Sequence, residues 1–341
     1  MNPEDAMALA IAESERVRGT TSPNPPVGCV IVDRDRKPVG FGATQPPGGR
    51  HAEIMALHDA GERARGGTAY VTLEPCSHWG RTPPCTDALI EAGVKHVVYA
   101  VADPNPEAAG GAEVLRKAGI TTADGVLREQ VEKGPLRAWL HFARTGRPHV
   151  TWKYAASLDG RVAAEDGTSR WISSEVSRAE VHELRTKIDA IVVGTGTVRA
   201  DDPALTARDA DGMPLDRQPL PVVVGHSDLP AGAKLEATAL HVRTHDPDEV
   251  LRLLAGKGVV DVLLEGGPTL AGAFLEQDRI DRVVAYVAPV LLGAGPAALK
   301  DAGVSTITDA VRLDVEEVTM SGPDMRISAV PQRRNGVHRD R

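Results

Sequence analysis

Short apolar segments alternate with helix-forming segments along nearly the whole chain, and this alternation restricts the fold more than any other feature. In the first half, segments with the length and composition of buried strands fall at 27–32, 68–75, 96–103 and 120–126. Segments with helical periodicity fall at 2–19, 51–65, 84–92, 113–118 and 127–145. We therefore predict a mostly parallel sheet with helices on both faces, which is a three-layer α/β domain.

Local signals agree with this alternation at the start of the chain. Asn2 can cap the first helix, and Pro3 suits its first position. Segments 27–32 and 38–42 flank the polar stretch 33–37, which predicts a hairpin.

A second series follows Gly146-Arg147-Pro148, where we place the domain boundary. Its near-continuous apolar runs, typical of a buried sheet, fall at 149–160, 189–198, 220–225, 260–267 and 282–293. Helices are expected between them at 174–187, 248–257 and 268–277. A chain of 341 residues fits two domains. We predict them at 1–146 and 149–331, with a polar, disordered tail at 332–341.

The segment His-Ala-Glu at 51–53 is followed by two Pro-Cys pairs, at 75–76 and 84–85. His51, Cys76 and Cys85 supply one imidazole and two thiolates, which can be the three protein ligands of a catalytic zinc with a fourth position open for water. Glu53, two residues after His51, can carry the proton of that water to a departing amine. The alternative is three unrelated residues, and the order and spacing of both Pro-Cys pairs disfavour it.

The positions of the cysteines support this interpretation. Cys85 begins a predicted helix, whose positive end favours a thiolate. Cys76 follows a buried strand, at the sheet edge where ligands are commonly presented. Cys29 lies inside an apolar strand and is expected to be a buried structural thiol.

Composition restricts the partners and the compartment. The net charge of −8 and the small number of aromatic residues (4 Trp, 4 Tyr and 3 Phe) disfavour a nucleic-acid polymer as partner. A few Arg and Lys side chains can still hold one phosphate of a small substrate. The odd count of three cysteines, without a signal peptide or an 18-residue apolar run, predicts the cytoplasm and no membrane association.

The segments TSPNPPVGCVIV, GGRHAE, YVTLEPCSHWGRTPPC and DPNP resemble the deaminase half of the bifunctional riboflavin-biosynthesis deaminase/reductases. Eight residues (77–84) separate the two cysteines, as in this family, whereas two separate them in most cytidine and nucleic-acid deaminases. The resemblance covers about residues 1–330. It implies a cytidine-deaminase-like three-layer α/β/α fold and hydrolytic deamination of a diamino-pyrimidinone ribosylamine phosphate.

The same resemblance implies that Asn24, His78 and Arg81 line the substrate pocket, where an amide suits the base and cations suit the phosphate. Without it, Asn24 would be interpreted as a turn residue and Arg81 as a solvated loop charge.

The segments WKYAASLDGRVAAEDGTSRWISS, VGTGTVRADDPALTAR and LEGGPTLAGAFL resemble the reductase half of the family, which has a dihydrofolate-reductase-like α/β fold. Residues 265–268 (Glu-Gly-Gly-Pro) end a predicted strand and open a helix, so their N–H groups can hold a pyrophosphate. This motif differs from the G-x-G-x-x-G fingerprint, and a Rossmann fold is not supported. By itself it could also be an ordinary turn at the start of a helix.

The resemblance also implies ligand contacts in this half. The positions that would contact NADPH are Ala156, Trp171, Thr197, Asp201, Gly267, Pro268, Thr269, Leu270, Ala271, Gly272 and Ala273. The positions that would contact the substrate are Ser169, Arg185, Leu205, Arg208 and Glu265. Of these, Arg185 and Arg208 suit a phosphate.

Lys153 and Asp201 are candidates for polar catalytic support at C1′ of the ring-opened sugar, where hydride is delivered. Either could be the acid, and the alternative is a salt bridge at a strand end.

The chain departs from the family in two places. Thr44 stands where the family often has a His before the zinc motif. Pro221, Gly225 and His226 stand where an Arg, an Asp, and a Thr or Ser beside the cofactor are usual.

We predict a bifunctional enzyme that binds Zn²⁺ and NADPH, acts on a small pyrimidine nucleotide and assembles as a homo-oligomer, the last because members of the family tend to assemble. The preference for NADPH over NADH rests on the resemblance alone. One alternative is a deaminase whose second domain binds a nucleotide but does not reduce. Another is a polynucleotide deaminase, which would need a basic face and the shorter cysteine spacing.

Overall fold

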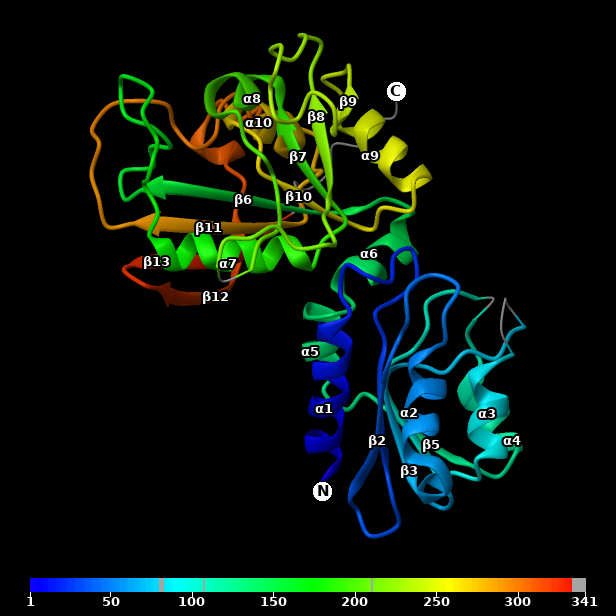
Figure 1. Ribbon diagram of the computed structural model, residues 1–341. Helices are drawn as coiled ribbons and strands as arrows, with labels where there is room; N and C mark the ends of the chain where they lie inside the picture. The colour runs from blue at the N-terminus through cyan, green and yellow to red at the C-terminus, as the bar shows by residue number, and fades with distance from the viewer. Residues whose placement is uncertain (80–82, 107, 210, 333–341) are drawn as a thin grey trace. The chain divides into compact units, whose positions relative to one another are not determined.

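The computed structural model describes residues 1–79, 83–106, 108–209 and 211–332. It divides into two compact units, Met1–Arg147 and Pro148–Arg341 (Figure 1). The predicted tail at 332–341 lies, from residue 333 onward, outside the described residues. In the described part of the chain, no helix is both long and apolar enough to cross a membrane.

The first unit contains a mixed five-stranded sheet. Its strands, in spatial order, are β2 (Pro38–Ala43), β1 (Gly28–Val32), β3 (Thr68–Leu73), β4 (His96–Val101) and β5 (Thr121–Asp124). β1 runs antiparallel to both of its neighbours, β2 and β3, whereas β3, β4 and β5 pair in parallel. Four of the five strands therefore run in one direction, in agreement with the prediction of a mostly parallel sheet, and β1 is the reversed strand. The predicted hairpin places two antiparallel strands at one edge of the sheet.

Helices cover both faces of this sheet (Figure 1). One face carries α1 (Pro3–Arg16) and α5 (Arg128–Lys133), and the other carries α2 (Ala52–Ala60), α3 (Cys85–Glu91) and α4 (Gly111–Lys117). The helices approach so closely that side chains are excluded beneath them. A Cβ atom on Gly28 would lie 1.9 Å from the Ala10 carbonyl oxygen of α1, and one on Gly42 would lie 2.2 Å from that of Ala52 in α2.

The predicted start of the first helix is confirmed, because the Asn2 side chain accepts a hydrogen bond from the Asp5 backbone N–H at 2.8 Å. Two longer predictions were wrong. The helical stretch 127–145 is divided into α5 and α6 (Arg137–Thr145) at Gly134-Pro135, since Pro135 lacks an N–H and disfavours helical backbone before it. The helix predicted at 51–65 ends at Ala60, and a 3₁₀ turn, η1 (Gly61–Ala64), follows.

The second unit contains an eight-stranded sheet. Its strands, in spatial order, are β12 (Leu313–Ser321), β13 (Asp324–Pro331), β11 (Arg282–Ala288), β6 (His149–Ser157), β10 (Asp261–Leu264), β7 (Ala190–Gly194), β8 (Leu220–Val224) and β9 (Leu240–Val242). The six strands from β11 to β9 are parallel, as the apolar runs predicted, and β12 and β13 add an antiparallel hairpin at one edge. Strands β9, β12 and β13 were not predicted from the sequence.

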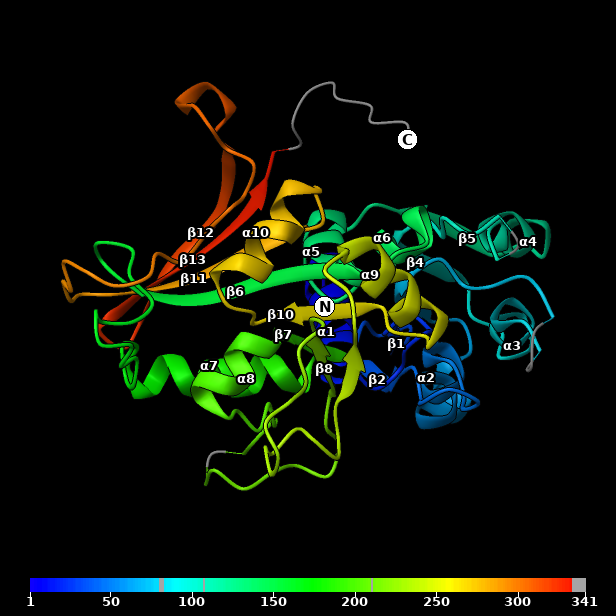
Figure 2. The ribbon, with the colours of Figure 1, turned by 90° about the horizontal axis from the view of Figure 1, so that it is seen from above.

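Two pairs of helices cover the second sheet (Figure 2). One face packs against α9 (Pro247–Gly256) and α10 (Pro268–Glu276), whose buried core includes Leu254 and Phe274. The other face packs against α7 (Glu175–Thr186) and α8 (Thr195–Asp201). A further 3₁₀ turn, η2, spans Ile307–Asp309.

The parallel strands end together, which brings several loops to one edge of the sheet. β7 and β8 both end at the pair Gly194 and Val224, and β6 and β11 end at the pair Ser157 and Ala288. The strand predicted at 189–198 was therefore too long, and Thr197 lies on α8 instead.

Candidate active sites

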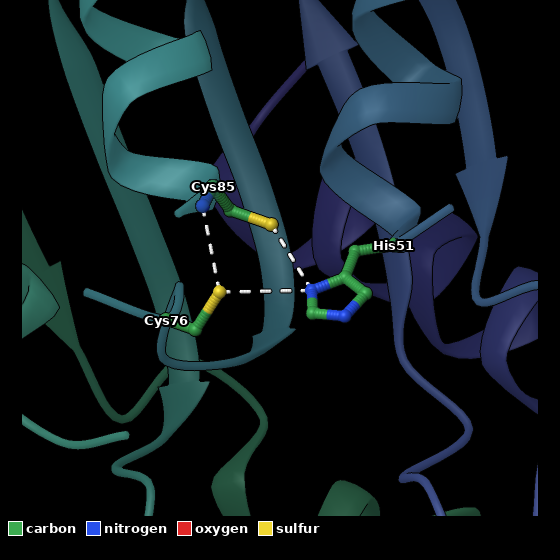
Figure 3. Close-up of side chains that lie close together, drawn as sticks. All are labelled: His51, Cys76 and Cys85. Atoms are coloured by element: carbon green, nitrogen blue, oxygen red, sulfur yellow. Dashed lines mark hydrogen bonds between the residues drawn. The ribbon is translucent and has the colours of Figure 1, made fainter. Parts of the chain in front are cut away.

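Three elements of the first unit bring His51, Cys76 and Cys85 together (Figure 3). His51 caps α2, Cys76 follows β3, and Cys85 is the first residue of α3. His51 Nδ1 lies 3.6 Å from Cys76 Sγ and 3.2 Å from Cys85 Sγ, and the three atoms lie within 4.8 Å of one another. Tetrahedral zinc with Zn–N near 2.1 Å and Zn–S near 2.3 Å separates such atoms by about 3.6 Å. The donor set therefore fits a zinc ion.

The surroundings stabilise a thiolate on Cys76. The Cys85 backbone N–H, at the start of α3, lies 3.4 Å from Cys76 Sγ. Hydrogen bonding with Cys85 lowers the pKa of the Cys76 thiol to about 4. Contact with Cys76 and burial raise the pKa of Cys85. A thiolate is the form of cysteine that binds metal.

Glu53 lies in the first turn of α2, only 4% exposed. Burial, and then the nearby charge of Cys76, raise the pKa of its carboxyl group to about 7. A carboxyl group in this position can accept and return a proton near neutral pH.

A pocket of about 600 Å³ opens beside these residues. It is lined by His51, Glu53 and Cys76 and by two residues that the family resemblance implied, Asn24 and His78. The third, Arg81, lies outside the described residues. Cys29 is fully buried as predicted, where burial raises the pKa of its thiol.

In the second unit, the Glu265 carboxylate lies between two largely buried cationic side chains, Arg185 and Lys153. The carboxylate accepts two hydrogen bonds from Arg185, from Nε at 2.8 Å and from Nη2 at 2.9 Å, and Lys153 Nζ lies 3.9 Å away. The three side chains are only 11–16% exposed. The two cations hold the pKa of Glu265 at about 2 against the effect of burial, and burial lowers the pKa of Lys153.

Glu265 directly precedes a glycine turn that opens α10. The Gly267 backbone N–H donates to Thr197 Oγ1 of α8 at 3.1 Å, so the first turns of two helices meet here. A Cβ atom on Gly266 would lie 2.8 Å from the Leu270 side chain. The partly exposed glycine backbone at the start of α10 suits the diphosphate of a dinucleotide.

The other implied cofactor positions on α10 have different surroundings. Gly267 to Leu270 are partly exposed, but Ala271 and Gly272 are buried, and a Cβ atom on Gly272 would lie 1.8 Å from the Lys300 carbonyl oxygen. Ala273 is partly buried.

The remaining predicted positions lie around this edge of the sheet. Trp171 is 68% exposed, with the Arg178 guanidinium 4.4 Å from its ring centre. Ser169 is half-buried, Ala156 lies in β6, and Leu205 is buried in the core beneath α8. In the described chain no ion pair or hydrogen bond joins Lys153 to Asp201, whose carbonyl oxygen accepts from Arg170 at 2.6 Å.

Comparison with known proteins covers both units. The RibD C-terminal domain matches residues 148–327, and the zinc-binding region of cytidine and deoxycytidylate deaminases matches residues 1–101. The riboflavin biosynthesis protein RibD of Mycobacterium tuberculosis H37Rv is 58% identical over 330 residues, which cover 96% of this chain and 97% of that protein. The chain belongs to the RibD family.

Solved structures of the RibD family agree over the full length. RibD of Acinetobacter baumannii superposes with a TM-score of 0.87 at 37% identity, covering 97% of this chain and 99% of that one. A deaminase/reductase of Thermotoga maritima superposes with a TM-score of 0.86 at 34% identity and the same coverage. The predicted folds, cytidine-deaminase-like and then dihydrofolate-reductase-like, are confirmed.

The chain is therefore a bifunctional riboflavin-biosynthesis enzyme with a zinc-dependent deaminase domain and an NADPH-dependent reductase domain. The predicted enzyme class and cofactors are confirmed by this membership.

The structure explains the first departure from the family. The Thr44 hydroxyl accepts a hydrogen bond from the Val27 backbone N–H at 3.1 Å and is buried. Thr44 still lines the pocket, but its hydroxyl group is turned to the main chain.

The second departure changes the loop after β8. Pro221 pairs with Ile191 of β7. Strand β9 pairs with residues 222–224 and does not reach Pro221, so the proline costs no hydrogen bond to β9. Gly225 has φ +133°, which side-chain-bearing residues rarely adopt, and His226 is exposed beside His245.

Four further residues line the deaminase pocket and were not predicted individually from the sequence: Glu74, Asp103, Asn105 and Trp139. Glu74 is structural, since its carboxylate accepts from the Ala112 N–H at 3.0 Å and from the Asp103 N–H at 3.3 Å. The motif DPNP (103–106) was a usable signal for Asp103 and Asn105, whereas no sequence pattern marks Trp139.

Proposed function

We propose that the first domain deaminates 2,5-diamino-6-(5-phosphoribosylamino)pyrimidin-4(3H)-one, and that the second reduces the product to 5-amino-6-(5-phosphoribitylamino)uracil with NADPH. The observation that carries this proposal is the set His51, Cys76, Cys85 and Glu53 at one pocket, in a chain that also contains a RibD reductase domain. The Thermotoga maritima relative is named as a diaminohydroxyphosphoribosylaminopyrimidine deaminase and 5-amino-6-(5-phosphoribosylamino)uracil reductase, which supports this substrate.

In the deaminase pocket, His51, Cys76 and Cys85 hold the metal. Zinc in this ligand set lowers the pKa of a bound water molecule to about 7. Glu53 would carry one proton of the attacking water to the neighbouring ring nitrogen and the other to the departing amino group, so that the C–N bond breaks, a carbonyl forms and ammonia leaves. The Asn24 amide binds the edge of the base, while His78 and Arg81 bind the phosphate.

In the reductase domain, we assign the phosphate to Arg208 rather than to Arg185. Both oxygens of Glu265 and the carbonyl oxygen of Thr206 already engage the Arg185 guanidinium. Arg208 is less occupied, because its Nε bonds the Thr206 hydroxyl at 3.0 Å and one Nη bonds Gly212 O at 2.9 Å.

The reduction itself adds hydride to C1′ of the ring-opened sugar and a proton to the adjacent nitrogen. We assign the proton to Lys153, because burial lowers the pKa of its ammonium group and makes it a better acid. Glu265 holds Lys153 in place, and Asp201, at the end of α8, orients the sugar. The partly exposed first turn of α10, Gly267 to Leu270, and Thr197, Trp171 and Ala156 contact the cofactor.

We infer self-association through the edge strand β12, where Val315, Val318 and Met320 are 59–65% exposed. All three cysteines are free, which supports a reducing cytoplasmic compartment.

A coupled assay tests the proposal. The purified, zinc-loaded protein receives the diamino-pyrimidinone nucleotide, and ammonia release is followed with and without NADPH, together with NADPH absorbance. We expect ammonia without NADPH and oxidation once NADPH is added. Ammonia without oxidation would leave a deaminase with a silent second domain, and no ammonia would overturn the central assignment.

A further inference from the structure

A single carbonyl group in the reductase domain receives two side chains from α7. The oxygen of Thr206 lies 3.1 Å from His182 Nδ1 and 3.0 Å from Arg185 Nη1. His182 and Arg185 are three residues apart, so they lie on the same side of the helix. Arg185 also binds both carboxylate oxygens of Glu265.

The segment that these two residues hold is otherwise irregular backbone. Leu205, before Thr206, has φ +52°, and it anchors the segment by its burial in the core. After Thr206, Gln218 binds both backbone groups of Ala207, accepting from N–H at 2.8 Å and donating to O at 3.0 Å. Backbone contacts hold the far end of the segment, where the Leu215 N–H donates to the Ala207 carbonyl oxygen at 3.1 Å and Arg208 pairs with Pro214. At Thr206 the contacts come from the side chains of His182 and Arg185.

Arg208 ends this segment, and Thr206 orients it. Arg208 Nε donates to Thr206 Oγ1 at 3.0 Å. A shift of the Thr206 backbone would carry the hydroxyl group away from Nε, so that the guanidinium could turn about its other bond, to the Gly212 carbonyl oxygen at 2.9 Å. His182 thus acts on Arg208 through one residue.

We propose that His182 is a positioning residue for binding of the substrate phosphate. The hydrogen bond from its Nδ1–H to the Thr206 carbonyl oxygen fixes the segment that orients Arg208. The inference rests on the proposed function, because it takes Arg208 as the phosphate ligand.

The protonation of His182 agrees with this role. A carbonyl oxygen only accepts, so Nδ1 must carry the hydrogen atom. Burial, and then the charges of Arg185 and Arg208, lower the pKa of His182, while the bond to Thr206 and the charge of Glu265 act in the opposite direction. A ring with a lowered pKa is neutral at neutral pH, and its Nδ1–H donor adds no charge that would compete with Arg208 for the phosphate.

Two amide substitutions separate the hydrogen bond from the rest of the ring. In His182→Asn the amide nitrogen occupies nearly the position of Nδ1 and can still donate to Thr206. In His182→Gln the amide group lies one bond further out, near the position of Nε2, and the bond is lost. Both variants keep a polar, uncharged side chain on a half-buried helix surface.

We expect His182→Gln to raise the KM for the phosphorylated reductase substrate about tenfold, which is the size of one neutral hydrogen bond. The kcat should stay within about twofold, since Lys153 is not touched. His182→Asn should stay within about threefold of the wild type. With the dephosphorylated substrate, the wild type and both variants should have similar KM values, because Arg208 then has no anion to hold.

A second substitution tests the same path from its other end. Thr206→Val removes the hydroxyl group that orients Arg208 but keeps the carbonyl group and the side-chain shape. It should also raise the KM for the phosphorylated substrate alone. Ammonia release by the deaminase domain serves as the control for an intact chain in every variant.

Three results would overturn the inference. They are an unchanged KM in His182→Gln, an equal loss in the Asn and Gln variants, and a loss that persists with the dephosphorylated substrate. The last two would show that the ring only packs. A wild-type protein without reductase activity would instead count against the proposed function.

Discussion

The ion-paired group Arg185–Glu265–Lys153 allows the loss of stability in Glu265→Gln to be predicted quantitatively. The substitution keeps the size of the side chain but removes the negative charge between two cations that are 14% and 16% exposed. We expect the variant to lose about 3 kcal/mol of reductase-domain stability at pH 7. Removing one partner of a buried ion pair typically costs about 3–5 kcal/mol.

The pKa of Glu265 gives the same magnitude. A pKa of about 2 in the folded protein, instead of the ordinary 4.5, corresponds to about 3 kcal/mol, because each pKa unit is worth about 1.4 kcal/mol. A lowered pKa stabilises the fold above the unfolded value and loses this effect as the carboxylate is protonated. The difference between wild type and variant should therefore be full above about pH 5.5 and should narrow as the pH falls from 4.5 toward 2.

Scanning calorimetry of the full chain measures this effect. The reductase transition is identified by its upward shift with NADPH. For a domain of this size, about 3 kcal/mol lowers its midpoint by roughly 6–12 °C. The transition of the deaminase domain should not move.

Glu183→Gln is the matched control. Glu183 lies on the exposed side of α7, the helix that carries Arg185, and pairs with Lys187 at 2.7 Å. That surface pair should be worth about 0.5 kcal/mol or less. If the two variants lowered the midpoint equally, or if the effect of Glu265→Gln did not change with pH, the electrostatic account of this group would be refuted.

Further substitutions test the remaining parts of both sites. Glu53→Gln should reduce ammonia release at least about 10²-fold while zinc content, measured by atomic emission, and reductase activity stay unchanged; substantial remaining deamination would contradict the proton-transfer role. Cys85→Ser should lower zinc content well below about one per chain, and full zinc retention would argue against Cys85 as a ligand. Gly225→Asp restores the residue usual in the family, but φ +133° and a Cβ atom 2.8 Å from Thr195 Oγ1 should make it cost about 1–3 kcal/mol by calorimetry; an unchanged midpoint would show that the loop adapts.

The deaminase site was accessible to sequence analysis because its residues stand at element ends that local patterns mark. His51 and Glu53 are two residues apart at the start of α2, and Cys85 opens α3 after a run of prolines. A strand end and two helix starts meet at one sheet edge, so the ligands could be placed from their order alone.

The reductase site was accessible only in part. Glu265 and Arg185 are 80 residues apart, and no periodicity indicates that one side chain turns to the other. The sequence marked Arg185 and Glu265 as separate ligand positions and did not indicate the ion pair between them. His182 was missed for the same reason, since a histidine on a helix does not indicate which carbonyl group it reaches.

Strand limits were overestimated where apolar residues continue beyond the last paired residue. The stretch 282–293 is apolar almost throughout, but β11 stops at Ala288, opposite the end of β6. The opposite error occurred at β12, whose sequence LDVEEVTMS is largely polar and exposed. An edge strand that is not buried lacks the apolar run by which the other strands were recognised.

The position of Glu265 immediately before Gly266 and Gly267 has a consequence for the order of ligand binding. The turn is joined to Glu265 by one or two peptide units, Glu265 binds Arg185, and Arg185 binds the Thr206 carbonyl group, so a dinucleotide that moved the turn would also move these groups. The dinucleotide and the pyrimidine substrate should therefore bind to the reductase domain cooperatively, each changing the affinity of the other by the same factor. A substitution in the turn that was intended to alter the dinucleotide preference would then also change the affinity for the pyrimidine.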